Sequence, residues 1–213
     1  MSISLIFILC ALGGYLLGSI PFGLVLTRLC GLGDIRKIGS GNIGATNVLR
    51  TGRKDLALLT VILDASKAGI AAFLAEKTVS TQDIIIFGLF TQLNIVAALI
   101  AGSCGVLGHN FPVWLKFKGG KGVASTFGFL LATMPQIALL ALFTWLIVAF
   151  ISRYSSLSAI TAAVLTPVYA FFLTEPIYCI FYTAIAVLVL YRHHANIARL
   201  LKGEESKISF KKK

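Results

Sequence analysis

The chain alternates between long apolar runs and short polar connections. Mostly apolar side chains occupy residues 5–26, 56–74, 84–101, 136–151, 157–173 and 177–190. Several of these runs approach the roughly 20 residues with which a helix crosses a bilayer. Residues 123–133 are also apolar, but they are too few for a full crossing, which is typical of a broken or tilted segment covered by protein. The pattern predicts an all-helical integral membrane protein with about seven transmembrane segments.

Composition agrees with this class, and the charges orient the chain. Of 213 residues, 57% are hydrophobic and 13% charged, whereas soluble domains have about 45–50% and about 25%; a soluble domain and a disordered chain are excluded. All but two of the 19 lysines and arginines lie in connections 28–55, 116–121 and 192–213 or at Arg153. With seven crossings these connections share one side. The positive-inside rule then places the N-terminus outside and the C-terminus in the cytoplasm.

Residues 1–213 are predicted to form a single membrane domain, because no fixed repeat and no soluble region interrupts them. The basic end, residues 206–213, is expected to be disordered. It is either attracted to anionic lipid or serves only to enforce the topology. The four cysteines form no C-x-x-C pair and fit small buried side chains, so neither a disulfide framework nor a metal site is expected.

The first loop, residues 39–50 (GSGNIGATNVLR), favours phosphate binding. Its glycines match the dinucleotide fingerprint G-x-G-x-x-G, but that motif requires a preceding strand in a soluble βαβ unit. Glycines still let backbone amides approach an anion, and an arginine can hold phosphate with two hydrogen bonds. A flexible connector is the alternative. The candidate binding residues are Ser40, Gly41, Asn42, Thr46, Asn47 and Arg50.

The second loop, residues 108–122 (GHNFPVWLKFKGGKG), predicts another anion site. It is not a nucleotide-hydrolysing P-loop, because Leu115 stands where the first glycine belongs and Gly122 where Ser or Thr would hold magnesium. A basic turn obeying the positive-inside rule would explain its lysines but not its glycines. The histidine is either structural or functional. The candidate residues are His109, Asn110, Gly119, Gly120, Lys121 and Gly122.

Two further polar groups accompany these loops. Asp64 and Lys67 lie three residues apart inside an apolar run, so they can pair on one helix face, as a functional group or as a structural anchor. After the last crossing, His193 and Asn196 share a face if residues 192–204 are helical, although an amphipathic interface helix would look similar. Arg153 and Ser156 lie on the same side of the membrane.

Together these motifs resemble a known family. Residues 18–23 (GSIPFG), the first loop, Asp64-x-x-Lys67, the second loop and His193-x-x-Asn196 follow one another as in the bacterial acyl-phosphate:glycerol-3-phosphate acyltransferases, which are integral-membrane enzymes. The resemblance covers residues 13–205. Ala68 departs from the family pattern, as do His194 and Ala195, which leaves the choice between His193 and His194 open.

The resemblance implies a seven-span enzyme of the bacterial cytoplasmic (inner) membrane with its site facing the cytoplasm. It would transfer an acyl group from acyl phosphate to the sn-1 hydroxyl of glycerol 3-phosphate, giving lysophosphatidate and inorganic phosphate in the first acylation of phospholipid synthesis. No cofactor, metal, nucleic acid or obligatory protein partner is expected. The implied catalytic residues are Ser40, Lys121, His193 and Asn196. Arg50, Arg153 and Ser156 would complete the polar site, with Asp64, Lys67 and Glu204 supporting it.

The sequence leaves alternatives open for the general base and for the class of protein. His193 is the candidate general base, oriented by Asn196, but a phosphate oxygen of the donor could accept the proton instead. A small anion or sugar-phosphate transporter would also suit charges within the membrane. The gathering of polar motifs at one face, and the lack of evident inverted repeats, favour the enzyme.

Overall fold

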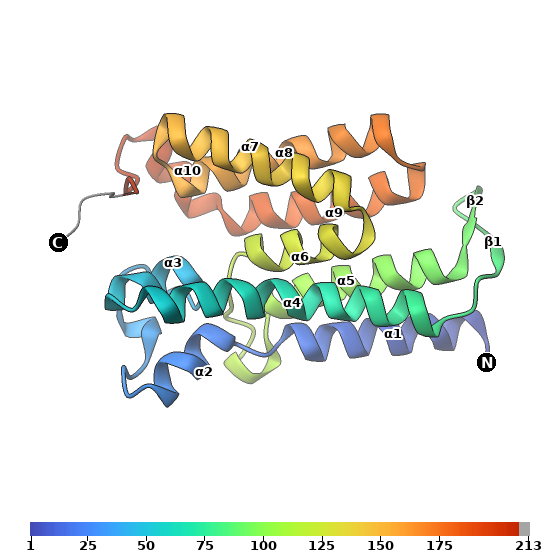
Figure 1. Cartoon of the computed structure of the whole chain (residues 1–213), viewed down its shortest axis with the longest axis horizontal. Coiled ribbons are helices and arrows are strands. Elements are labelled where there is room, and N and C mark those ends of the chain that lie inside the picture. The colour runs from blue at the N-terminus through green and yellow to red at the C-terminus, as the bar shows by residue number, and fades with distance from the viewer. Residues whose placement is uncertain (209–213) are drawn as a thin grey trace. The chain divides into compact units, whose positions relative to one another are not determined.

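The computed structural model describes residues 1–208, and their fold is mostly helical (Figure 1). The chain divides into two compact units, Met1–Thr133 and Met134–Lys213. The first unit contains α1 (Ile3–Gly18), α2 (Phe22–Leu29), η1 (Ile35–Lys37), α3 (Ala45–Val48), η2 (Leu49–Thr51), α4 (Lys54–Thr78), β1 (Asp83–Ile86), β2 (Leu89–Gln92), α5 (Leu93–Asn110), η3 (Val113–Leu115) and α6 (Val123–Thr133). The second contains α7 (Pro135–Ser152), α8 (Ser155–Leu173), α9 (Pro176–Arg192) and α10 (His194–Leu201).

Helices occupy most of the apolar runs that the sequence analysis identified as membrane segments. Within residues 1–208, five stretches are long and apolar enough to cross a membrane: Ile3–Leu29, α4, Leu93–Leu115, α7 and α8. The pair α9 and α10, bent by 59°, makes a sixth, and α6 is the short apolar helix expected at 123–133. A mostly helical membrane fold is therefore confirmed. The number of crossings, the sides of the termini and the single domain stay predictions.

The third predicted segment begins later than expected. We expected a membrane segment over residues 84–101, but β1 and β2 form an antiparallel hairpin with Ile85 opposite Phe90, and α5 begins at Leu93. The physical reason lies in the local sequence. Three consecutive isoleucines favour a strand, and Phe87 and Gly88, both at positive φ, form the two-residue turn of a hairpin. The all-helical expectation thus has one exception.

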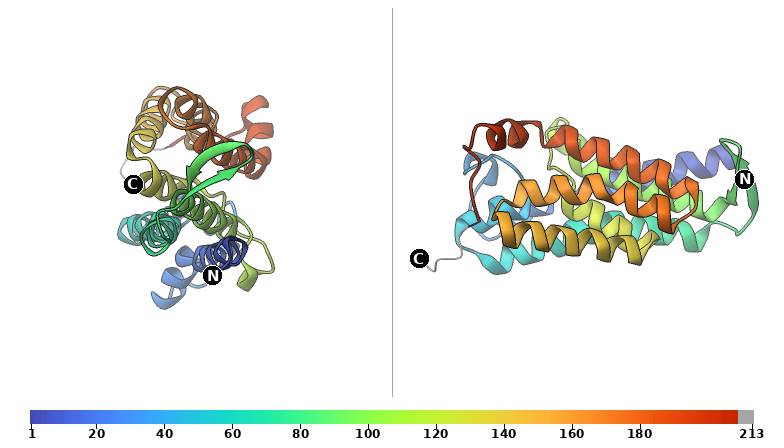
Figure 2. Two further views of the ribbon diagram at one scale, coloured as in Figure 1. Left: turned by 90° about the vertical axis from the view of Figure 1, so that its right-hand side faces the viewer. Right: turned by 90° about the horizontal axis from the view of Figure 1, so that it is seen from above.

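Small residues let the helices of the first unit approach closely. A Cβ on Gly14 would overlap the carbonyl of Ala101, and a Cβ on Gly18 would overlap that of Gly105, so α1 and α5 pack backbone to backbone. Figures 1 and 2 show α1, α4 and α5 side by side, with the N-terminus and the hairpin at one end of the unit and α2 and α3 at the other. The first loop therefore lies at the end of this unit away from the N-terminus.

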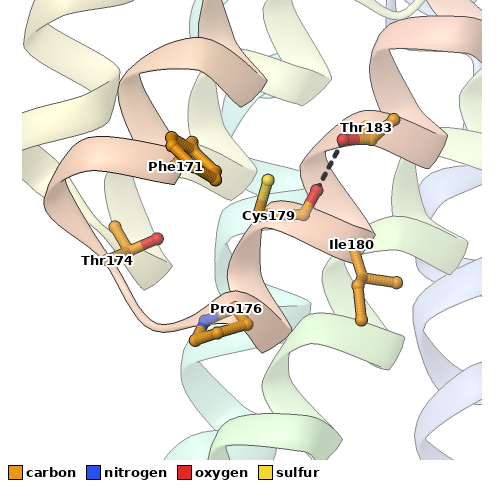
Figure 3. A pocket seen from close by; sticks show the side chains of 6 residues that line it. All are labelled: Phe171, Thr174, Pro176, Cys179, Ile180 and Thr183. Carbon is orange, nitrogen blue, oxygen red and sulfur yellow. Dashed lines mark hydrogen bonds between the residues drawn. The ribbon is translucent and has the colours of Figure 1, made fainter. Parts of the chain in front are cut away.

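In the second unit α7, α8 and α9 run side by side, joined by short turns (Figure 2). A mainly apolar hollow of about 510 Å³ lies where α8 ends and α9 begins (Figure 3). Residues Phe171, Thr174, Pro176, Cys179, Ile180 and Thr183 line it. Ser156 and His193 lie at the opposite ends of these two helices, so the hollow is separate from the predicted polar residues of this unit.

Candidate functional site

In the first unit, Asn47 holds the first loop from inside. Its side chain is buried, and Nδ2 donates to the carbonyl oxygens of Ile35, Ile38 and Asn42 at 2.8–3.0 Å. Its Oδ1 accepts a hydrogen bond from the Ser40 amide at 3.3 Å. These bonds use the side chain within the loop, so Asn47 supports the loop, and its role as a phosphate ligand stays a prediction.

Arg50 is the cation of the first loop that best fits phosphate binding. It is exposed and lies against Gly39, where a Cβ would overlap its side chain. Three neighbouring arginines are paired with acids: Arg28 and Arg36 with Asp34, and Arg53 with Asp55. Among residues 1–208, no ion pair involves Arg50. Ser40, Gly41 and Thr46 are also exposed, and Asn42 is half-buried.

The second loop folds back onto the end of α5. The amide of Gly119 donates to the Asn110 carbonyl at 3.2 Å, and that of Gly120 to the His109 carbonyl at 3.0 Å. A Cβ on Gly119 would overlap the His109 carbonyl and Pro112, and a Cβ on Gly120 would overlap the His109 ring. We expected both amides to face an anion. The structure shows instead that these glycines are needed for close packing.

The start of α6 offers other groups to an anion. The first amides of a helix have no acceptor within it, and α6 begins directly after Lys121 and Gly122. Asn110 lies beside this point, fully buried, and a Cβ on Gly122 would contact both its amide atoms. Within residues 1–208 neither Asn110 Oδ1 nor Nδ2 has a hydrogen-bond partner. A buried amide left unpaired is costly, so Asn110 is a strong candidate ligand.

The two loops share a hydrophobic core in the first unit. Leu115 of the second loop packs against the buried side chains beneath the first loop, which are Leu24, Ile35, Ile43, Val48, Leu56 and Ala57. The structure therefore brings together the two phosphate-binding candidates that the sequence identified separately.

Asp64 and Lys67 form the predicted pair, buried in α4. Lys67 Nζ lies 2.9 Å from Asp64 Oδ1, and the two residues are 1% and 3% exposed, respectively. The ammonium is also 2.9 Å from the Ile20 carbonyl oxygen and 2.9 Å from His109 Nδ1. The pair thus joins α4 to the histidine on which the second loop folds.

In the second unit, His193 lies at the bend between α9 and α10. Its ring is buried, and Nδ1 is 2.8 Å from the Val189 carbonyl oxygen. A carbonyl only accepts, so Nδ1 carries a hydrogen and Nε2 is the basic nitrogen of the neutral ring. His194 is exposed, with Nδ1 bonded to the Tyr191 carbonyl. The buried position favours His193 for chemistry, a choice that the sequence left open.

Glu205 gathers three polar side chains of the second unit. Its Oε1 accepts hydrogen bonds from Ser156 Oγ at 2.8 Å and Asn196 Nδ2 at 2.7 Å, and its Oε2 accepts one from Arg199 Nε at 2.7 Å. Burial alone would raise the pKa of Glu205, but these hydrogen bonds outweigh burial, so the pKa lies below its usual value. Glu205 therefore ties α8 to α10 as a carboxylate.

The sequence pointed to the neighbouring Glu204, which is exposed. Gly203 follows α10 with a φ of 73° and turns the chain, while the Glu204 amide bonds the Arg199 carbonyl at 2.8 Å. A glycine after a helix signals such a turn. It does not indicate which of two successive carboxylates faces back toward the helix, and that is why Glu205 was missed.

Arg153 directly follows α7 and bonds to Ile208, near the C-terminus of the chain. It adopts a left-handed conformation, its carbonyl accepts from the Ile208 amide at 2.7 Å, and its guanidinium donates to the Ile208 carbonyl at 3.2 Å. The disorder expected for residues 206–213 stays a prediction. Residues 209–213 of the predicted basic tail lie outside the described residues.

Within residues 1–208, no three His, Cys, Asp or Glu side chains come together as metal ligands. The first unit contains the two loops that we predict to bind anions, and the second contains a buried histidine. Anion-binding loops hold phosphorylated molecules and stabilise their charge, and a histidine can transfer protons. The expectation that no cofactor is needed stays a prediction.

Known proteins share this fold and much of the sequence. Residues 8–203 match a family described as glycerol-3-phosphate acyltransferase. The chain is 58% identical to the glycerol-3-phosphate acyltransferase of Rhodospirillum rubrum, covering 96% of this chain and 92% of that protein. It is 54% identical to that of Paramagnetospirillum magneticum, over 95% and 94%. PlsY (YgiH), solved as an integral membrane glycerol 3-phosphate acyltransferase in its glycerol 3-phosphate form, superposes with a TM-score of 0.84 at 37% identity, over 95% of this chain and 96% of that one.

The fold and the sites therefore define an integral membrane acyltransferase. More particularly, the chain belongs to the glycerol-3-phosphate acyltransferase family, as the order of its motifs led us to expect.

Proposed function

We propose that this enzyme takes its acyl group from acyl phosphate and forms lysophosphatidate and inorganic phosphate, the first acylation step of phospholipid synthesis. One observation carries the proposal. The chain matches a relative solved both in a glycerol 3-phosphate form and in a lysophosphatidic acid form, over 95% of its length in each case. Those two molecules are the acceptor and the product of the proposed reaction. The acyl phosphate donor rests on the resemblance of the motifs.

The proposed step is a direct transfer. The sn-1 hydroxyl oxygen of glycerol 3-phosphate attacks the acyl carbonyl carbon, and the bond between that carbon and the phosphate oxygen breaks. The hydroxyl proton passes to a base and then to the departing phosphate, so the products are an ester and inorganic phosphate. An acyl phosphate is a mixed anhydride and needs no further activation. The protein has to position two phosphorylated substrates and stabilise the leaving charge.

His193 is our proposed base, with Nε2 accepting the hydroxyl proton. The hydrogen bond from Nδ1 to the Val189 carbonyl supports this role, because it orients the ring and leaves the lone pair on Nε2 in the neutral form. Asn196 follows His193 by three residues, and Glu205 accepts hydrogen bonds from both Asn196 and Ser156. These two side chains would orient the substrate.

The loops of the first unit are our proposed phosphate binders. Arg50 supplies a guanidinium that is not paired with an acid within residues 1–208, and Ser40 a hydroxyl. Lys121 stands at the start of α6, and Asn110 presents a buried amide there. A guanidinium, an ammonium and helix amides are the groups that bind phosphate best. We further propose that the site faces the cytoplasm of a bacterial inner membrane, which rests on the distribution of basic connections.

The test compares donors. The purified full chain in detergent or a lipidic mesophase receives glycerol 3-phosphate with either palmitoyl phosphate or palmitoyl-CoA, with and without EDTA. We expect equal amounts of lysophosphatidate and phosphate from palmitoyl phosphate only, at a rate that EDTA leaves unchanged. Turnover with palmitoyl-CoA but not with palmitoyl phosphate would overturn the proposal that acyl phosphate is the donor. Folded protein that turns over neither donor would overturn the proposed reaction and leave transport to be assayed.

A further inference from the structure

We propose that Lys67 is a positioning residue that keeps a hydrogen on Nε2 of His109, so that the second loop folds against an N–H group. His109 and His193 would then hold opposite tautomers in their neutral forms. The functional part of this inference rests on the proposed function, because it assumes that the second loop binds phosphate. The tautomer itself does not.

The contacts of Lys67 leave little choice of proton arrangement. Its Nζ has three neighbours at 2.9 Å: Asp64 Oδ1, the Ile20 carbonyl oxygen and His109 Nδ1. The first two only accept hydrogen bonds. An ammonium has three hydrogens and no lone pair, so it would satisfy all three neighbours, and His109 Nδ1 would be an acceptor. A neutral imidazole that accepts at Nδ1 carries its hydrogen on Nε2.

The charge of Asp64 excludes the main alternative, a neutral His109 with its hydrogen on Nδ1. If Lys67 were a neutral amine, His109 Nδ1 would donate to it. Asp64 is 3% exposed. In the described part of the chain, the groups within 4 Å of its carboxylate that can carry a positive charge are Lys67 and His109. A buried carboxylate needs a compensating charge, so His109 would then be the cation and would carry hydrogens on both ring nitrogens. In either arrangement Nε2 keeps its hydrogen.

That hydrogen lies on the side of the ring facing the second loop. A Cβ on Gly120 would overlap Nε2 itself, and the Gly120 amide bonds back to the His109 carbonyl. The loop is therefore fitted to His109 through both backbone and ring. An unprotonated Nε2 would place a lone pair against the glycine turn. Lys67 prevents this through its contact with Nδ1, although Lys67 is not part of the loop.

His193 provides the internal comparison. Its Nδ1 faces a carbonyl oxygen, so its neutral ring has the hydrogen on Nδ1 and the lone pair on Nε2. The chain has only three histidines, and His194 Nδ1 also faces a carbonyl oxygen. One histidine is thus expected to differ from the other two.

The experiment is nitrogen NMR of the full chain labelled with ¹⁵N-histidine, with ring nitrogens identified through their couplings to ring carbon protons. The His109 signals are those that persist when His193 and His194 are both changed to Gln. We expect His109 Nε2 to be protonated, and Nε2 of neutral His193 to be unprotonated. An unprotonated His109 Nε2 beside a protonated Nδ1 would overturn the proposal. This measurement needs no turnover, so it is decided independently of the proposed reaction.

A variant links the tautomer to the loop. Asp64→Asn combined with Lys67→Met removes both buried charges together, which avoids a lone buried carboxylate, and Lys77→Met on the exposed end of α4 is the matched control. The double variant should lose the single His109 tautomer and raise the KM for glycerol 3-phosphate about fivefold, the scale of one lost hydrogen bond. The control should change neither. A double variant that keeps the wild-type spectrum and KM would show that Lys67 does not position His109.

Discussion

At the residue scale, the glycines of the second loop are defined by what lies against them. Gly120 faces the His109 ring, and its amide is bonded to the His109 carbonyl. A methyl group at this position has to push the loop and the ring apart, whatever the chemistry of the site.

We therefore expect Gly120→Ala to raise the KM for glycerol 3-phosphate about tenfold, with a smaller change in kcat, because displacement of a binding group by about 1 Å is costly. Gly13→Ala is the control, since a Cβ there meets nothing within 4 Å. Steady-state kinetics in mesophase decide this. An unchanged KM in Gly120→Ala would mean that the second loop does not position this substrate.

The two adjacent histidines make a second comparison. His193 is buried with its tautomer set by Val189, and His194 is exposed. Loss of a general base costs about 10²–10⁴-fold, so we predict a decrease of that size in kcat for His193→Ala and little change for His194→Ala. Equal kcat values in both variants would remove His193 from the chemistry and favour a donor phosphate oxygen as base.

The lowered pKa of Glu205 implies that the stability of the folded chain depends on pH. Its folded-state pKa lies below the ordinary value of 4.5, so the unfolded chain takes up its proton first as the pH falls. The stability from this carboxylate is fully present above pH 4.5 and is lost progressively below it, until the folded pKa is passed. Melting temperatures from pH 7 to pH 3 should fall less steeply in Glu205→Gln than in Glu204→Gln, which retains the network. Parallel curves would contradict the assignment of Glu205.

At the element scale, the contact of α1 with α5 depends on one face of α1. Gly13 and Gly14 are neighbours on the same helix, yet a Cβ on Gly13 meets open space and one on Gly14 overlaps the Ala101 carbonyl. Alanine favours a helix over glycine by about 0.5–1 kcal/mol, whereas overpacking costs about 1–3 kcal/mol.

The two substitutions should therefore act in opposite directions. Thermal unfolding in detergent is expected to show a slightly higher melting temperature for Gly13→Ala and a clearly lower one for Gly14→Ala. If both variants rise together, the close approach of α1 and α5 is not what stabilises the first unit.

At the scale of the whole molecule, apolar run length predicted the membrane helices because it is a property of many residues at once. The hairpin at residues 83–92 was absorbed into such a run, since isoleucine and phenylalanine are apolar in strands and helices alike. For the site, the sequence predicted the motifs but not the contacts that their side chains make. Asn47 faces inward and Glu205 replaces Glu204 because the local turns decide which side chain points back, and residue spacing does not carry that information.

The central claim, attack of the sn-1 oxygen on the acyl carbon with release of the donor phosphate, is tested most directly by an isotope label. Glycerol 3-phosphate carrying ¹⁸O in its sn-1 hydroxyl is incubated with palmitoyl phosphate and the purified enzyme, and both products are examined by mass spectrometry. The account predicts lysophosphatidate with all of the label and an equal amount of unlabelled phosphate. Label in the released phosphate, or phosphate released without lysophosphatidate, would contradict it.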